Sequence, residues 1–123
     1  IETKVLTEKP VLVYHRICGN INESEAQIGV EKAMNIINQV IDQYNFFDMI
    51  LDVRGYAFNS LNARRTWSLG FKENNTLKDY VKCVAVVGDN SYQMRKEKEM
   101  METAKLKFFT DIADAKHWLQ NLE

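Results

Sequence analysis

The sequence predicts a single α/β domain built on a mixed sheet of about five strands with about four helices. Short apolar runs alternate along the chain with longer segments in which apolar residues recur every three or four positions, as in amphipathic helices. The resulting order is strand, strand, helix, strand, helix, strand, helix, strand, helix. This order calls for an antiparallel first hairpin followed by parallel strands joined through right-handed crossovers. A chain of 123 residues suits one such domain, spanning residues 1–123.

The first hairpin joins residues 2–7, a weak strand candidate, to residues 11–18, a strong one. The intervening Glu-Lys-Pro supplies the turn. Side chains alternate between the two faces of a strand, which puts His15 opposite the face that carries most of the apolar bulk. We therefore expect His15 at an edge or at the surface.

The later elements follow from the same patterns, helped by capping residues. Asn22 and Glu25 form a capping box for the long first helix. Ser91 can cap the third helix, and Thr110 or Asp111 the last. The predicted segments are helices at 22–44, 61–72 and 92–104, a last helix from about 111, and strands at 47–53, 80–87 and 105–109.

Composition excludes several classes of partner. Sixteen basic and seventeen acidic residues leave a net charge of −1, which provides no overall field for nucleic acid. Cys18 and Cys83 lie in apolar runs, so we expect both to be buried and the protein to be in the reducing cytoplasm. The two cysteines and two histidines have no zinc-site spacing, and no pattern calls for another metal or a cofactor. No apolar run approaches about 18 residues, so no transmembrane segment is predicted.

The stretch from Phe47 to Ser60 is the first place to look for a site. It reads as a buried strand that leaves through Arg54 and Gly55 and enters a helix capped by Asn59 or Ser60. Binding groups in open α/β sheets gather at the carboxyl ends of strands. The candidates there form an anion or partner surface, or alternatively an ordinary solvated basic face. They are Asp52, Arg54, Asn59, Arg64, Arg65 and Asp89.

Aromatic and methionine side chains offer material for a second kind of site, an apolar pocket. The same residues can equally serve as core, which is the commoner role of such side chains. The candidates are Tyr56, Phe58, Trp67, Phe71, Tyr92, Met94 and Met101.

Three segments carry a resemblance to a known family: MILDVRGYAFNS at 49–60, VAVVGD at 84–89 and FFTDIADAKHWL at 108–119. They resemble the SpoIIAA-like group, whose fold is shared by STAS domains and has been likened to the Sec14 lipid-carrier domain. In STAS domains the central strand ends in Asp-Leu-Ser and the next helix begins at Asp-Ser. Asp52 matches that strand end, and Asn59 with Ser60 fall close to the helix start.

The resemblance implies a regulatory role. In anti-sigma antagonists of the family the serine at the helix start is phosphorylated, and Ser60 would inherit that role. The leading hypothesis is a non-enzymatic module that binds a protein partner through residues 52–65 and the neighbouring loop at 88–91. Ser60 has a simpler alternative role as an ordinary helix cap.

Two other classes of function stay open. The Sec14-like comparison implies a binder or carrier of a small apolar or lipid-like ligand. An enzyme is the weaker reading, because His15 and His117 lie on no catalytic motif and no catalytic residue can be named. The sequence also leaves a homodimer open, since an incompletely covered sheet face or an exposed aromatic patch can pair two copies.

Overall fold

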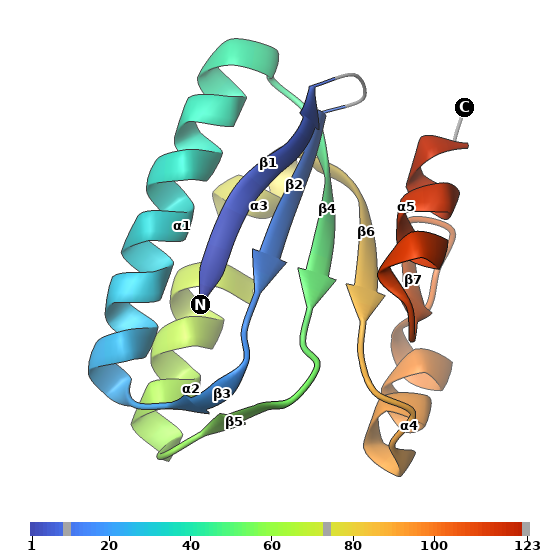
Figure 1. Cartoon of the computed structure of the whole chain (residues 1–123). Coiled ribbons are helices and arrows are strands. Elements are labelled where there is room, and N and C mark those ends of the chain that lie inside the picture. Colours follow the sequence, from blue (N-terminus) through green and yellow to red (C-terminus); the bar gives the residue numbers. More distant parts are fainter. Residues whose placement is uncertain (9–10, 73–74, 122–123) are drawn as a thin grey trace.

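A five-stranded mixed sheet with the order β1-β2-β4-β6-β7 forms the centre of the computed structural model (Figure 1). The structure describes residues 1–8, 11–72 and 75–121, without the side chains of residues 8, 72, 75, 76, 92 and 93. β1 pairs antiparallel with β2, and every later pair in this sheet is parallel, which confirms the predicted architecture. The strands are β1 (Glu2–Glu8), β2 (Val11–Arg16), β4 (Phe47–Asp52), β6 (Val81–Val87) and β7 (Leu106–Phe109).

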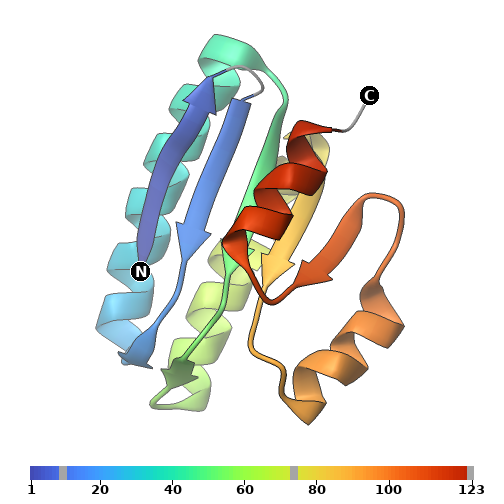
Figure 2. The ribbon, with the colours of Figure 1, turned by 45° about the vertical axis from the view of Figure 1, so that its right-hand side comes forward.

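Helices cover the two faces of this sheet unequally, as Figures 1 and 2 show. The long α1 (Glu23–Tyr44) and the short α2 (Leu61–Trp67) pack together on one face, and α5 (Ile112–Gln120) packs on the other. Each face has its own core cluster, which is why the central strands alternate between two buried sets of side chains. α4 (Tyr92–Met101) follows β6 and lies beside the carboxyl end of that strand (Figure 1).

Several short elements were not predicted. β3 (Gly19–Ile21) and β5 (Tyr56–Phe58) pair in parallel as a separate two-stranded sheet. The segment predicted as one helix over 61–72 is α2 followed by a π-helical turn, η1 (Ser68–Lys72), and α3 (Asn75–Tyr80) then leads into β6. Strands of three residues are too short to show alternation, so the sequence pattern carried no signal for them.

The capping predictions are confirmed. The Asn22 side chain accepts from the Glu25 amide at 2.8 Å, and the Glu25 carboxylate accepts from the Asn22 amide at 3.4 Å. Ser60, Ser91 and Asp111 likewise cap α2, α4 and α5. These caps set where each helix begins, because they satisfy amides that have no partner within the helix.

The expectation that His15 lies at the surface is wrong, because α1, α2 and η1 pack over the face of β2 that carries it. His15 is fully buried, and its ring stacks on Phe71 with 3.8 Å between centroids. Trp67 Nε1 donates to His15 Nε2 at 3.1 Å, so Nδ1 carries the proton of the neutral ring and donates to Thr3 Oγ1 at 2.8 Å. Burial lowers the pKa of His15 to about 3, helped by the positive charge of the amino group of Ile1.

The expectation that both cysteines are buried is wrong for Cys18. Cys18 is exposed because β2 ends at Arg16 and the chain then runs out toward β3. Cys83, inside β6, is partly buried. Burial raises the pKa of its thiol, and the negative charge of Asp48 adds to that effect.

Candidate functional site

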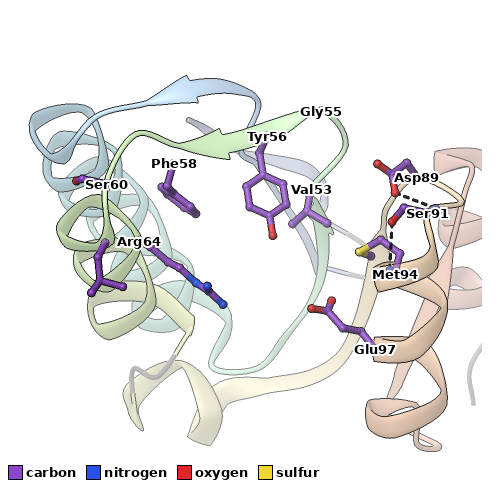
Figure 3. Close-up of a pocket in the computed structure, with 11 residues that line it drawn as sticks. Val53, Gly55, Tyr56, Phe58, Ser60, Arg64, Asp89, Ser91, Met94 and Glu97 are labelled. Atoms are coloured by element: carbon purple, nitrogen blue, oxygen red, sulfur yellow. Dashed lines mark hydrogen bonds between the residues drawn. The ribbon is translucent and has the colours of Figure 1, made fainter.

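The carboxyl ends of β4 and β6 lie side by side, since Asp52 pairs with Val87 in the parallel ladder. The residues that follow these two strands therefore begin at the same edge of the sheet and diverge, one segment toward α2 and the other into α4. Between them opens a cleft of about 490 Å³ (Figure 3). We call this feature the edge cleft.

One wall of the edge cleft comes from β5 and α2 and includes Tyr56, Phe58, Ser60 and Arg64. Ser60 is exposed, and its Oγ accepts from the Ala63 amide at 3.1 Å, which makes it the cap of α2. Arg64 follows one helical turn later, so its side chain emerges from the same side of the helix. Ser60 and Arg64 thus face the cleft together.

The opposite wall comes from the loop after β6 and from α4, and includes Asp89, Ser91, Met94 and Glu97. Asp89 Oδ1 accepts from the Ser91 amide at 3.1 Å, and Ser91 Oγ accepts from the Met94 amide at 3.2 Å (Figure 3). Gly88 gives Met94 its place, because a Cβ at residue 88 would overlap the end of the Met94 side chain. The loop and the first turn of α4 are therefore held in one arrangement.

Tyr56 belongs to the wall formed by β5 and α2, and its side chain points into the cleft. Figure 3 shows its hydroxyl, the Arg64 guanidinium and the Glu97 carboxylate all directed into the space between α2 and α4. Burial raises the pKa of Tyr56, and the negative charge of Glu97 raises it further. The positive charge of Arg64 opposes this rise and Asp89 adds to it, so the three charged groups all act on one hydroxyl.

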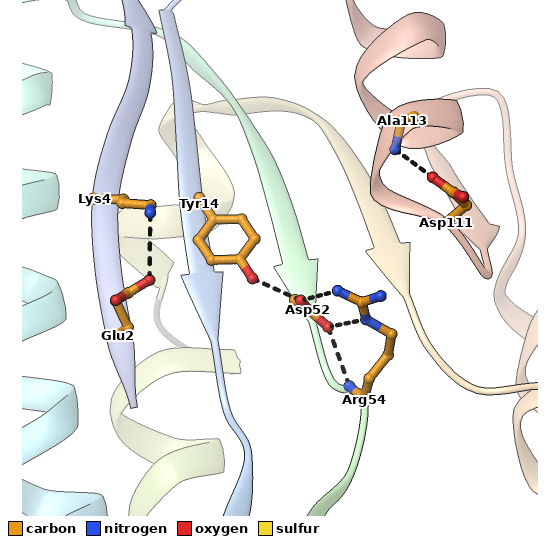
Figure 4. A network of polar contacts seen from close by, with 7 residues as sticks. All are labelled: Glu2, Lys4, Tyr14, Asp52, Arg54, Asp111 and Ala113. Carbon is orange, nitrogen blue, oxygen red and sulfur yellow. Dashed lines mark hydrogen bonds and ion pairs between the residues drawn. The ribbon is translucent and has the colours of Figure 1, made fainter.

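Asp52 and Arg54 belong to a different feature, a hydrogen-bond network with Tyr14 on the face of the sheet that carries α5 (Figure 4). We call it the buried network, because its central carboxylate is buried. Asp52 is completely buried and accepts from the Tyr14 hydroxyl at 2.6 Å. Arg54 donates to both carboxylate oxygens, from Nε at 3.0 Å and from Nη2 at 2.9 Å. The Arg54 amide adds a bond at 3.2 Å, so the network fastens the turn after β4 to β2.

The protonation of this network follows from its hydrogen bonds. Burial alone would raise the pKa of Asp52, but the bonds from Arg54 and Tyr14 outweigh it and the pKa is lowered. Burial and the bond to Asp52 together raise the pKa of Tyr14 to about 12. Asp52 is therefore a carboxylate held between two donors, and its role is structural.

The candidates for an anion or partner surface are thus divided. Ser60, Arg64 and Asp89 line the edge cleft. Asp52 and Arg54 form the buried network, so the three guanidinium groups expected beside α2 do not gather there. Arg65 and Asn59 are exposed but do not line the cleft, and the Asn59 amide donates to the Ile21 carbonyl at 2.8 Å.

The candidates for an apolar pocket are divided as well. Tyr56, Phe58 and Met94 line the edge cleft. Trp67, the last residue of α2, and Phe71, in η1, are buried in the core around His15. Met101 is 40% exposed and does not line the cleft, and the side chain of Tyr92 lies outside the described residues.

Glu97 is the residue that sequence reasoning missed. It lies in the charged run RKEKE, which reads as a solvated helix face. Its spacing from Met94 was the available signal, since the two residues lie three positions apart and so share one side of α4.

Within residues 1–8, 11–72 and 75–121, no three His, Cys, Asp or Glu side chains come together as metal ligands would. None of the helices in this part of the chain has the length and apolarity needed to cross a bilayer.

The fold and this edge of the sheet define a class of protein: a small α/β domain with a mixed five-stranded sheet and an open cleft at the carboxyl ends of its parallel strands. The family model described as SpoIIAA-like matches residues 12–120, and the chain belongs to this family. None of the curated proteins matches the chain.

Two solved structures resemble this one. An uncharacterised protein from Shewanella loihica with a SpoIIAA-like fold superposes with a TM-score of 0.67 at 18% sequence identity, covering 96% of this chain and 92% of its own. The Bacillus cell fate determinant SpoIIAA, in its phosphorylated form, superposes with a TM-score of 0.50 at 14% identity, covering 95% of this chain and 97% of its own. At these identities the likeness shows the shared fold.

Proposed function

We propose that this chain is a non-enzymatic regulatory module that binds a protein partner through residues 52–65 and the loop at 88–91. The observation that carries the proposal is the position of Ser60, an exposed hydroxyl at the rim of the edge cleft and one helical turn from Arg64. Membership of the SpoIIAA-like family supports a regulatory role, and the related Bacillus protein has a phosphorylated form.

Phosphorylation of Ser60 would change the charge of one wall of the cleft. A phosphoryl group adds about −2 at neutral pH together with three strong acceptor oxygens. Arg64 lies four residues further along the helix, within reach of those oxygens, and a guanidinium binds phosphate with paired N–H donors. The Arg64 guanidinium would then be paired with the phosphate of Ser60. A partner that had bound the free guanidinium would lose this contact.

The apolar surface around the cleft favours a protein partner. Leu61 is 61% exposed and Leu69 66% exposed, and the two lie about two turns apart on the same side of α2 and η1. Tyr56 in the cleft and Met101 at the end of α4, each 40% exposed, add further apolar surface. Large exposed apolar side chains beside a polar depression are typical of protein interaction sites.

The test begins with the intact mass of the protein purified from the cells that make it, followed by peptide mapping. We expect a phosphoryl group on Ser60. Partner co-purification is then compared between Ser60→Ala and Ser60→Asp, because aspartate keeps the helix cap while adding charge. We expect the two variants to retain different partners.

Asp111→Ala is the matched control, since Asp111 also caps a helix, α5, but does not line the cleft. We expect its partner profile to match that of the unmodified protein. A bare chain in the mass measurement together with identical partner profiles for Ser60→Ala and Ser60→Asp would contradict the switch.

A further inference from the structure

The two walls of the edge cleft carry opposite charge. Arg64 projects from the α2 wall, and Asp89 and Glu97 belong to the α4 wall. We propose that the cleft binds a small zwitterion, with its amine against Asp89 and Glu97 and its anionic group against Arg64. This ligand site goes beyond the proposed partner surface, because it would give the module a small-molecule input.

Among the described residues, the charged side chains of the cleft form no salt bridge. Among the described residues the salt bridges join Lys4 to Glu2 and Arg54 to Asp52, and neither involves the cleft. Arg64 and Glu97 face the same space without an ion pair, while the guanidinium of Arg54 is fully committed to a buried carboxylate. Groups that remain unpaired inside a concave site are the ones a charged ligand can pair with.

The acidic residues of the α4 wall are placed to bind an amine. The amide of Ser91 holds Asp89 at Oδ1, which orients the carboxylate at the mouth of the cleft. Glu97 approaches from deeper along α4, and its side chain is only partly exposed. Both carboxylates add to the negative potential of this wall, which favours a bound cation.

Tyr56 suits the centre of such a ligand. Its ring packs edge-on against Phe58 with 5.6 Å between centroids, which fixes its position in the wall. An aromatic face attracts an ammonium group through its quadrupole, and the hydroxyl can donate to an anion or accept from an amine. Val53, Phe58 and Met94 supply apolar contact for the carbon skeleton between the two charges.

The charge arrangement also excludes other ligand classes. A simple anion would meet Arg64 but be repelled by Asp89 and Glu97. A purely apolar molecule would desolvate these charged groups without pairing them, which is costly. The volume of about 490 Å³ lies within the usual range for small-molecule sites, so a zwitterion of modest length fits both the charge and the space.

The test uses unbranched ω-amino acids that differ in the number of methylene groups between the amine and the carboxylate. Binding to the full chain is followed by amide chemical shifts in two-dimensional NMR. We expect one length to bind best, with a dissociation constant of about 1 mM or tighter and shifts centred on Tyr56, Arg64 and Glu97. The alkylamine and the alkyl carboxylate of that length, which each lack one charge, should bind at least about tenfold more weakly.

Matched variants assign the two charged contacts. Arg64→Ala and Glu97→Gln should each weaken binding of the best probe by about tenfold or more. Arg65→Ala and Glu99→Gln are the controls, because both residues are exposed on the same helices and neither lines the cleft. We expect the controls to bind the probe as the unmodified protein does.

The proposal is overturned if no probe of any length binds at about 10 mM, or if amine and carboxylate alone bind as well as the zwitterion. It is also overturned if Arg64→Ala and Glu97→Gln leave binding unchanged. These outcomes are distinguishable from failure of the partner switch, since probe binding is measured on the unphosphorylated chain in the absence of any partner.

Discussion

Two arginines ten residues apart show how this protein divides its polar groups. Arg54 grips the buried carboxylate of Asp52 through two side-chain nitrogens, whereas Arg64 points into the edge cleft and forms no ion pair with any described residue. The difference comes from burial of the partner. A fully buried carboxylate must be paired if the fold is to be stable, so Arg54 is committed to structure and Arg64 remains available for binding.

His15 belongs with Asp52 in this comparison. It is a buried polar residue whose two ring nitrogens are both hydrogen-bonded, to Trp67 and to Thr3. No buried side-chain nitrogen or oxygen among the described residues lacks a partner. The polar groups inside the sheet therefore serve the fold, and those of the cleft are the ones from which function is expected.

The largest expected effect is loss of the buried network. Asp52→Ala leaves the Tyr14 hydroxyl without its acceptor and releases Arg54, so we expect a loss of about 3 kcal/mol in unfolding free energy. Urea unfolding measures this loss. Glu97→Gln, the matched carboxylate of the cleft, should change stability by less than about 0.5 kcal/mol. Equal losses for the two variants would remove the distinction between the regions.

The next effect concerns pH. The pKa of His15 is about 3 in the folded chain and about 6.5 in the unfolded chain, so the unfolded chain binds more protons between these values. The contribution of the neutral His15 to the free energy of unfolding is full above about pH 6.5. It is lost as the pH falls, by about 1.4 kcal/mol per pH unit. Urea unfolding at pH 6.5 and pH 5 should show a fall of about 2 kcal/mol.

His15→Phe is the control for this pH dependence. This variant should be less stable at neutral pH, because the Trp67 indole N–H loses its acceptor. Its unfolding free energy should, however, depend less on pH between pH 6.5 and pH 5. A slope that survives the substitution would assign the dependence to other groups.

A smaller effect is expected at the two caps of the cleft. Ser60→Ala and Ser91→Ala should each cost about 1 kcal/mol, since each removes an acceptor for a helix amide. Ser60→Asp should stay within a few tenths of the unmodified protein, because aspartate is an equally good cap. Thermal unfolding measures the series. A destabilised Ser60→Asp would show that the cleft does not tolerate the added charge.

The smallest effect on stability should come from Arg64 itself. Arg64→Ala should change the unfolding free energy by less than about 0.5 kcal/mol, because the side chain is exposed and unpaired. Arg54→Ala should cost more, since it leaves a buried carboxylate with one donor fewer. Urea unfolding of both variants measures the difference between their unfolding free energies. A loss at Arg64 as large as that at Arg54 would show that the cleft charge already serves the fold.

Much of the fold could be predicted from local patterns. The alternation of apolar runs with amphipathic segments gave the sheet and its helices, and Asn22, Ser60, Ser91 and Asp111 each marked a helix start. These signals are local, because a cap bonds within its own first turn. The alternation along β2 was also right, but it could not show that α1, α2 and η1 cover the face that carries His15.

The candidate site was predicted only in part, because its geometry depends on contacts between distant segments. Trp67 bonds to His15 across 52 residues, which turns it into the core and away from the cleft. Asp52 bonds to Tyr14 across 38 residues, which withdraws Arg54 as well. A local sequence pattern does not show which of several similar side chains will form such a long-range hydrogen bond. Ser60, Arg64 and Asp89 line the edge cleft because the segments that carry them leave the sheet at the neighbouring ends of β4 and β6.

Gly88 gives the molecule a way to adjust the edge cleft without altering its charges. Its missing side chain leaves room for the thioether of Met94, which forms part of the α4 wall. A single added methyl group at this position would displace a flexible side chain and leave the backbone in place. The size of the cleft is thus adjustable by one small substitution.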